Sequence, residues 1–130
     1  MEHQSLVLCD TNIIIELYKN NTSIITALHK IGQEKIAISL ITAGELLFGA
    51  INKRELNRIS KDIENLQTLP LDESIGIIAL DLLQKHTLSH KLALPDALIA
   101  ATALHYKIPL YTLNQKDFRP ISGLKLYNPW

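Results

Sequence analysis

The chain has 130 residues, with thirteen basic and thirteen acidic side chains that cancel at neutral pH. The zero net charge excludes any assignment to a polyanion-binding class on bulk charge alone, and no apolar run reaches the length that a transmembrane helix needs. Cys9 is the single cysteine, so the chain has no internal disulfide and we expect a reducing, cytoplasmic setting. The length suits one compact domain spanning residues 1–130.

An uninterrupted apolar run at residues 6–9 predicts a strand that is buried on both faces. Asp10 follows it directly, and Thr11 and Asn12 are residue types that commonly begin a helix. We therefore expect a strand, an abrupt turn and a helix, with Asp10 at the carboxyl end of the strand. In open α/β sheets this edge is where ligands bind.

Short strands alternate with helices along the rest of the chain. The spacing of apolar and turn-forming residues predicts helices over about residues 13–17, 24–31, 41–49, 53–66, 73–89 and from 94 onwards, strands over 36–40, 67–71 and 108–112, loops over 86–92 and 114–120, and a short edge strand over 124–127. This alternation specifies the α/β class, with a parallel sheet of four to five short strands and helices on both faces.

Four acidic residues occupy positions that this topology brings to one edge of the sheet. Asp10 follows the first strand, and Glu45 lies about one turn into the helix after the second strand. Asp96 lies in the first turn of an alanine-rich helix, and Asp117 lies in the loop after the fourth strand. Because strand ends and helix starts meet at the carboxyl edge of a parallel sheet, we expect these carboxylates to converge.

Each acid also has an ordinary structural role that competes with this interpretation. An aspartate in the position of Asp10 forms turns, and one in the position of Asp96 is favoured by the helix dipole. Glu45 suits an exposed helix surface, and Asp117 suits a loop. The coincidence of all four positions at one edge favours a site.

Crowded carboxylates repel one another and cannot all stay ionised unaided. A divalent cation resolves the repulsion, and an all-oxygen ligand set suits Mg²⁺ or Mn²⁺ better than Zn²⁺. The five histidines are scattered and show no zinc-like spacing. We therefore predict that Asp10, Glu45, Asp96 and Asp117 bind Mg²⁺ or Mn²⁺ and carry the chemistry; whether one ion or two bind stays open.

Four short motifs follow one another along nearly the whole chain. They are Asp10-Thr11-Asn12, Thr42-Ala43-Gly44-Glu45-Leu46 followed by Gly49, Pro95-Asp96-Ala97-Leu98-Ile99-Ala100, and Thr112-Leu113-Asn114-Gln115-Lys116-Asp117-Phe118. In this order and at this spacing they resemble the PIN-domain ribonucleases, most closely the VapC-type toxins of bacterial and archaeal toxin–antitoxin pairs.

The resemblance implies a PIN-like fold and a metal-dependent endoribonuclease that leaves a 5′-phosphate and a 3′-hydroxyl. By motif match, Asp10, Glu45 and Asp96 correspond to the first three acids of the family. The fourth acid maps to Asp117, with Asn114 in the same loop as the alternative.

The same match implies supporting residues and partners. Four polar residues stand at positions that hold a carboxylate or a metal-bound water, namely Thr11, Asn12, Thr112 and Asn114. VapC-type relatives commonly pair with an antitoxin and commonly dimerise. The expected partners are therefore an RNA substrate, a cognate antitoxin and a second copy of this chain.

Two other functions compete with the nuclease interpretation. Haloacid-dehalogenase-type phosphatases also place a nucleophilic aspartate after the first strand, but they need a second one two residues later, where Asn12 stands. A non-catalytic PIN-like module for RNA binding or assembly would have a degenerate site, and the intact Asp10, Glu45 and Asp96 argue against it.

Overall fold

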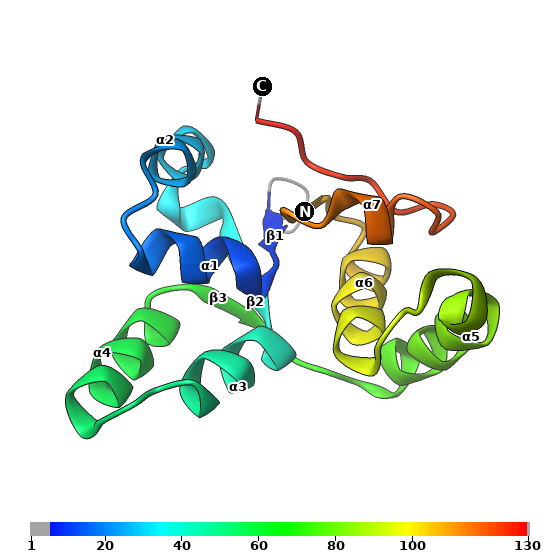
Figure 1. Cartoon of the computed structure of the whole chain (residues 1–130), viewed down its shortest axis with the longest axis horizontal. Helices are drawn as coiled ribbons and strands as arrows, with labels where there is room; N and C mark the ends of the chain where they lie inside the picture. Colours follow the sequence, from blue (N-terminus) through cyan, green and yellow to red (C-terminus); the bar gives the residue numbers. More distant parts are fainter. Residues whose placement is uncertain (1–5, 130) are drawn as a thin grey trace.

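The computed structural model describes residues 6–129 and contains a sheet of four parallel strands (Figure 1). The strand order is β3-β2-β1-β4. These strands are β1 (Val7–Cys9), β2 (Ile36–Ser39), β3 (Gln67–Leu69) and β4 (Leu110–Tyr111). In the centre of the sheet, Leu8 of β1 is in register with Ala37 of β2 on one side and with Leu110 of β4 on the other.

Helices follow every strand and cover both faces of the sheet. They are α1 (Thr11–Tyr18), α2 (Thr22–Ile31), the short 3-10 helix η2 (Gln33–Lys35), α3 (Leu40–Phe48), α4 (Lys53–Glu64), α5 (Glu73–His90), α6 (Leu94–Tyr106) and α7 (Gln115–Phe118). Figure 1 shows α1 to α4 on one side of the strands and α5 to α7 on the other. The predicted α/β class with helices on both faces is confirmed.

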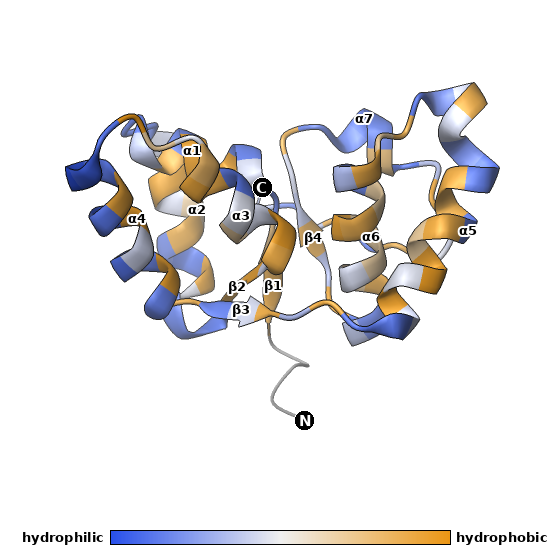
Figure 2. Cartoon of the chain, turned by 90° about the horizontal axis from the view of Figure 1, so that it is seen from below, coloured by the Kyte–Doolittle hydropathy of each residue, from blue (hydrophilic) through white to orange (hydrophobic). Residues whose placement is uncertain are grey.

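Two hydrophobic cores explain why the strands lack an alternating pattern. Leu6, just before β1, and Leu8 within it face a core shared with α5 and α6, whereas Val7 and Cys9 face a core shared with α1 to α4. Since both faces are covered, alternate residues are all apolar and all buried. Figure 2 shows the apolar sides of the helices turned towards the strands.

Helix α6 is the most deeply buried helix, and its small side chains account for its position. Its buried residues include Ala97, Ala100, Ala101 and Ala103, each at most 1% exposed. Side chains of this size let the helix backbone approach the sheet closely. The close approach brings the start of α6, where Asp96 lies, to the carboxyl edge of the strands.

Three segments differ from the sequence-based expectation. Helix α5 continues to His90, where a loop over 86–92 was expected, because neither glycine nor proline interrupts this segment; the helix ends only at Lys91, which adopts the left-handed conformation with φ of 51°. The expected loop over 114–120 contains α7. The expected edge strand over 124–127 is reduced to one parallel bridge, between Leu110 and Leu126.

The strand boundaries are also shorter than expected, since α3 begins at Leu40 directly after β2 and β4 contains two residues. Asp10 itself caps α1, so the helix begins at Thr11. Within residues 6–129, no helix combines the length and apolar character required to span a bilayer.

Candidate active site

Asp10 lies at the carboxyl end of β1 and is held by two hydrogen bonds. Its Oδ1 accepts from the backbone N–H of Thr11 at 2.7 Å, and its Oδ2 accepts from the hydroxyl of Thr112 at 2.8 Å. The residue is only 5% exposed. Burial raises the pKa of the Asp10 carboxyl, and the charge of Glu45 raises it further, while the two hydrogen bonds lower it. Asp10 is therefore fixed in place but costly to ionise without a cation.

Glu45 comes from α3 and meets the start of α1. The hydroxyl of Thr11 donates to Glu45 Oε1 at 2.6 Å and lies 2.9 Å from the hydroxyl of Thr42, which is fully buried. Thr11 thus serves two acids, since its N–H holds Asp10 and its side chain holds Glu45. Sequence reasoning did not single out Thr42, although its place three residues before Glu45 puts the two on one helix face.

Asp96 lies in the first turn of α6, immediately after Pro95. The pKa of its carboxyl is raised to about 6, first by burial and then by the charges of Asp10, Glu45 and Asp117. The charges of the three other acids therefore act on the Asp96 carboxyl. That the four carboxylates form one site stays a prediction.

Asp117 is presented by α7, the short helix that replaces the expected loop. The side-chain amide of Asn114 donates to Asp117 Oδ2 at 2.6 Å. The backbone N–H of Asn114 donates in turn to the hydroxyl oxygen of Thr112 at 3.0 Å. Asn114 therefore positions Asp117 and connects α7 to Thr112, the residue that donates to Asp10. Which of Asn114 and Asp117 completes the ligand set stays a prediction.

Thr112 is the centre of the polar network behind the acids. Its hydroxyl donates to Asp10 and accepts from Asn114, and the amide of Asn12 approaches it at 3.4 Å. The side-chain oxygen Oδ1 of Asn12 accepts from the backbone N–H of Leu113 at 3.3 Å. These two contacts of Asn12 secure the loop after β4, so Asn12 supports the site indirectly.

The donor set fits a hard divalent cation. Four carboxylates supply oxygen ligands only, as Mg²⁺ and Mn²⁺ prefer, and their mutual repulsion is the feature that a cation would relieve. Burial raises the pKa of the neighbouring Cys9 thiol to about 12, so Cys9 offers no thiolate. Among residues 6–129, however, no three His, Cys, Asp or Glu side chains are already gathered as ligands of one ion.

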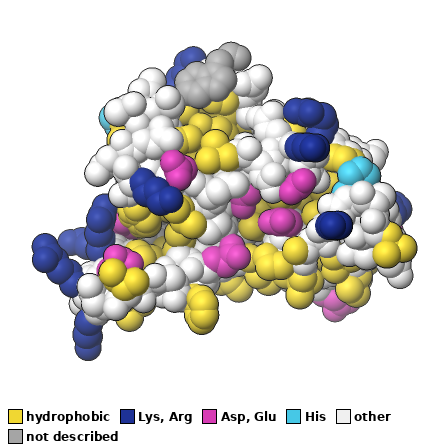
Figure 3. Space-filling view, in the orientation of Figure 1, with side chains coloured by type: hydrophobic (Ala, Val, Ile, Leu, Met, Phe, Trp, Pro, Cys, Tyr) yellow, Lys and Arg dark blue, Asp and Glu magenta, His cyan; other side chains and the backbone are white. Residues whose placement is uncertain are grey.

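The four acids lie on a face of the molecule outside the cavity of about 580 Å³. Figure 3 shows acidic side chains across the middle of this face and basic side chains around its periphery. A cavity of about 580 Å³ lies between α1, α2 and α4, and none of the four acids lines it. A second cavity, of about 390 Å³, lies between α1, α3 and α4 and includes Glu45 in its wall.

The PIN domain family model matches residues 7–124. The chain belongs to the PIN-domain family. This assignment rests on nearly the whole described chain, and the four acids and the parallel sheet lie inside the matched range. No significant match was found among curated proteins.

Solved structures support the same assignment for this PIN domain. A chain of a toxin–antitoxin complex from Klebsiella pneumoniae is 33% identical, over 95% of this chain and 98% of that chain, with a TM-score of 0.80. FitAcB from Neisseria gonorrhoeae is 26% identical, over 96% and 99%, with a TM-score of 0.78. VapBC from nontypeable Haemophilus influenzae is 28% identical, over 95% and 98%, with a TM-score of 0.79. The resemblance to VapC-type toxins is thus confirmed.

Proposed function

We propose that this PIN domain is a metal-dependent endoribonuclease and the toxin of a toxin–antitoxin pair. The observation that carries the proposal is that Thr11 donates to both Asp10 and Glu45, while burial and the charges of Asp10, Glu45 and Asp117 raise the pKa of Asp96. A fold that crowds four carboxylates at a sheet edge gains little from them unless a cation is bound. Similarity to toxin–antitoxin structures supports the same function.

In the proposed reaction, some side chains would bind the cation and others would orient the carboxylates. Asp10, Glu45, Asp96 and Asp117 would hold Mg²⁺ or Mn²⁺. Thr11 would orient the first two acids, because its N–H donates to Asp10 and its hydroxyl donates to Glu45. A bound cation would lower the pKa of a coordinated water and neutralise charge that develops on the phosphodiester.

Cleavage of RNA by the purified protein tests this proposal. We expect cleavage with Mg²⁺ or Mn²⁺, none with a chelator, and products that carry a 5′-phosphate and a 3′-hydroxyl. Asp10→Asn, Glu45→Gln, Asp96→Asn and Asp117→Asn should each lower the rate by about a hundredfold or more, because even residues that only support metal ligands change activity by about 10–100-fold.

Asp81→Asn is the matched control. Asp81 is an exposed acid on α5 that pairs with Lys85 at 3.0 Å, away from the site. It should cleave RNA as the wild type does. If Asp96→Asn remained as active as Asp81→Asn, the assignment of the acids would be wrong. RNA binding without cleavage in the wild type would instead favour the non-catalytic module.

We also propose that this PIN domain acts in the cytoplasm, binds a cognate antitoxin and forms a homodimer. The support is its similarity to chains of a toxin–antitoxin complex and of VapBC. Expression should arrest growth, and co-expression of the neighbouring gene should relieve the arrest and yield a complex that copurifies. Light scattering of the isolated chain should give the mass of a dimer, and a monomer mass would exclude the self-association.

A further inference from the structure

Two histidines meet at the carboxyl end of α5, and Figure 1 shows α6 between this helix and the strands. The sequence predicted a loop over residues 86–92, so the spacing of His86 and His90 indicated no common face. In the structure α5 continues to His90. The two residues are therefore four positions apart in one helix, and side chains at this spacing lie on the same face.

The two imidazole rings lie next to each other. Their centroids are 5.6 Å apart, and their planes are inclined by 62°. Two imidazoles bound to one tetrahedral ion have centroids about 5 Å apart, since each Zn–N bond measures about 2.0–2.1 Å. A small rotation of the side chains therefore suffices to bring one nitrogen of each ring within bonding distance of the same ion.

A contact with a neighbouring residue orients one of the rings. The Ser89 hydroxyl lies 2.8 Å from Nδ1 of His90, at hydrogen-bond distance. This contact occupies Nδ1 and leaves Nε2 as the nitrogen that can bind a metal ion. Histidine ligands of metal ions in proteins usually have their second ring nitrogen hydrogen-bonded in this way, which fixes the orientation of the ring. The Ser89 contact is therefore a second observation, independent of the ring spacing, that fits metal binding.

The charges around the rings also suit a cation. His86 and His90 lie in the last turns of α5, where the helix dipole places partial negative charge. Lys85 is paired with Asp81 at 3.0 Å, so its charge is partly compensated. Lys91 is exposed and opposes part of the attraction.

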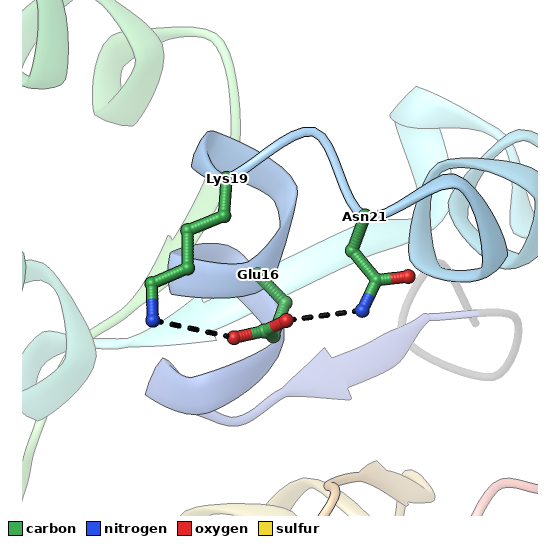
Figure 4. A network of polar contacts seen from close by, with 3 residues as sticks. All are labelled: Glu16, Lys19 and Asn21. Carbon is green, nitrogen blue, oxygen red and sulfur yellow. Dashed lines mark hydrogen bonds and ion pairs between the residues drawn. The ribbon is translucent and has the colours of Figure 1, made fainter.

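The polar cluster at the end of α1 differs from this pair, because its carboxylate is satisfied within the protein. Figure 4 shows Glu16 paired with Lys19 at 3.6 Å, while Glu16 also accepts from the Asn21 amide at 3.0 Å. In the part of the chain that the structure describes, neither His86 nor His90 forms an ion pair with a carboxylate. The two rings are therefore open to a ligand from outside the chain.

We propose that His86 and His90 form a metal site, distinct from the four acids, which binds Zn²⁺ or a similar transition-metal ion through one nitrogen of each ring. Imidazole nitrogen suits Zn²⁺, whereas carboxylate oxygen suits Mg²⁺ or Mn²⁺. The protein supplies two ligands of a tetrahedral ion, and water completes the set. Since the ion joins two consecutive turns, it stabilises the end of α5. The proposal does not depend on the ribonuclease function.

Competition between the protein and a fluorescent zinc chelator tests the site at pH 7.5, with excess Mg²⁺ present to occupy the acids. The wild type should bind Zn²⁺. His86→Gln and His90→Gln should each bind it at least about tenfold more weakly, because each loses a ligand. The double variant should be little weaker than either single variant, since chelation needs both rings. Wild-type affinity in both single variants would overturn the proposal.

His29→Gln is the matched control, because His29 is exposed on α2 and has no histidine one helical turn away. It should keep the wild-type affinity. Adding Leu88→His to His90→Gln restores the number of histidines in α5, but residues two positions apart do not share a face. The affinity should therefore stay as weak as in His90→Gln. Recovery of the wild-type affinity would contradict binding through one face of the helix.

Thermal unfolding in excess Mg²⁺ gives a second readout. Added Zn²⁺ should raise the Tm of the wild type and of His29→Gln, because it binds the folded chain, and should leave His86→Gln and His90→Gln unchanged. Circular dichroism shows whether each variant is folded. An equal rise in all four proteins would overturn the site. Zinc affinity that Asp96→Asn loses and the two α5 variants retain would assign the ion to the acids and would also contradict the proposal.

Discussion

At the scale of single residues, Asp96 reports most directly on the crowding of charge. Its carboxyl has a pKa of 3.8 when unperturbed and about 6 in the folded protein. The fold therefore favours the protonated form. Without metal, this residue's contribution to stability is fully present below pH 4 and is lost as the pH rises through 6.

Replacing Asp96 by asparagine should remove that penalty. In EDTA at pH 7.5, Asp96→Asn should raise the free energy of unfolding by about 1 to 2 kcal/mol, a value reduced for the hydration that the half-buried carboxylate retains. At pH 4 the two proteins should differ little. Urea denaturation at both pH values checks this, with Asp81→Asn as control; a loss of stability at pH 7.5 would show that Asp96 is not under repulsion.

Thr112 provides a second test at this scale, because its hydroxyl is buried and joins Asp10 to Asn114. Thr112→Val keeps the shape but leaves the Asn114 N–H without this acceptor. We expect a loss of about 1–3 kcal/mol in the free energy of unfolding. The pKa of Asp10 should also rise, since the hydroxyl hydrogen bond lowers it.

Metal titrations at several pH values test the expected rise in the pKa of Asp10. In Thr112→Val, the pH at which Mn²⁺ binding is half complete should move upwards, because Asp10 must ionise before it binds. Thr112→Ser retains the hydroxyl and should keep the wild-type midpoint. If the valine and serine variants had the same midpoint, the hydroxyl would have no influence on Asp10.

At the scale of elements, the positions of the candidate site residues could be predicted because strand ends and helix starts can be recognised in the sequence. Asp10 could be placed at the end of a strand from the apolar run before it, and Asp96 at the start of a helix from the Pro-Asp pair. A parallel sheet brings such strand ends and helix starts to its carboxyl edge. The hydroxyl network could not be derived in this way. Which rotamer joins Thr11 to Glu45, or Thr112 to Asp10, depends on packing across segments remote in sequence.

The misplaced boundaries have a related cause. Residues 86–92 contain polar types common in loops, yet α5 continues to His90, because neither glycine nor proline interrupts it. The helix ends at Lys91, which adopts the left-handed conformation, and the Thr87 hydroxyl donates to the carbonyl oxygen of Leu92 just beyond the helix. Residues 115–118 are polar apart from Phe118, which is fully buried and anchors α7. Local composition indicates loops in both places. In α7 the burial of Phe118 overrides it, whereas residues 87–90 are exposed and continue α5 without such burial.

Helix α6 gives a prediction at this scale. Ala100 is fully buried against the sheet side of the helix, so Ala100→Leu should force α6 outward and destabilise the protein by about 1–3 kcal/mol. Ala93→Leu, at the exposed start of the same helix, should change stability little. Thermal unfolding compares the two variants. Equal melting temperatures would mean that α6 is less tightly packed than described.

At the scale of the whole molecule, no single element contains the site. Its four acids come from the end of β1 and from α3, α6 and α7, and three bonds of the polar network join residues 31, 34 and 102 positions apart. These elements belong to the two hydrophobic cores on opposite faces of the sheet. A cation that binds all four acids would therefore link both cores, and its binding should stabilise the folded chain as a whole.

Calorimetric titration of Mn²⁺ into the metal-free protein at pH 7.5 tests this claim most directly. We predict saturable binding to the wild type and to Asp81→Asn with the same affinity, and affinity at least about tenfold weaker for Asp96→Asn, since loss of a ligand should exceed the loss of a supporting group. Circular dichroism shows whether the variants are folded. Equal Mn²⁺ affinity in a folded Asp96→Asn variant would contradict a cation shared by these acids.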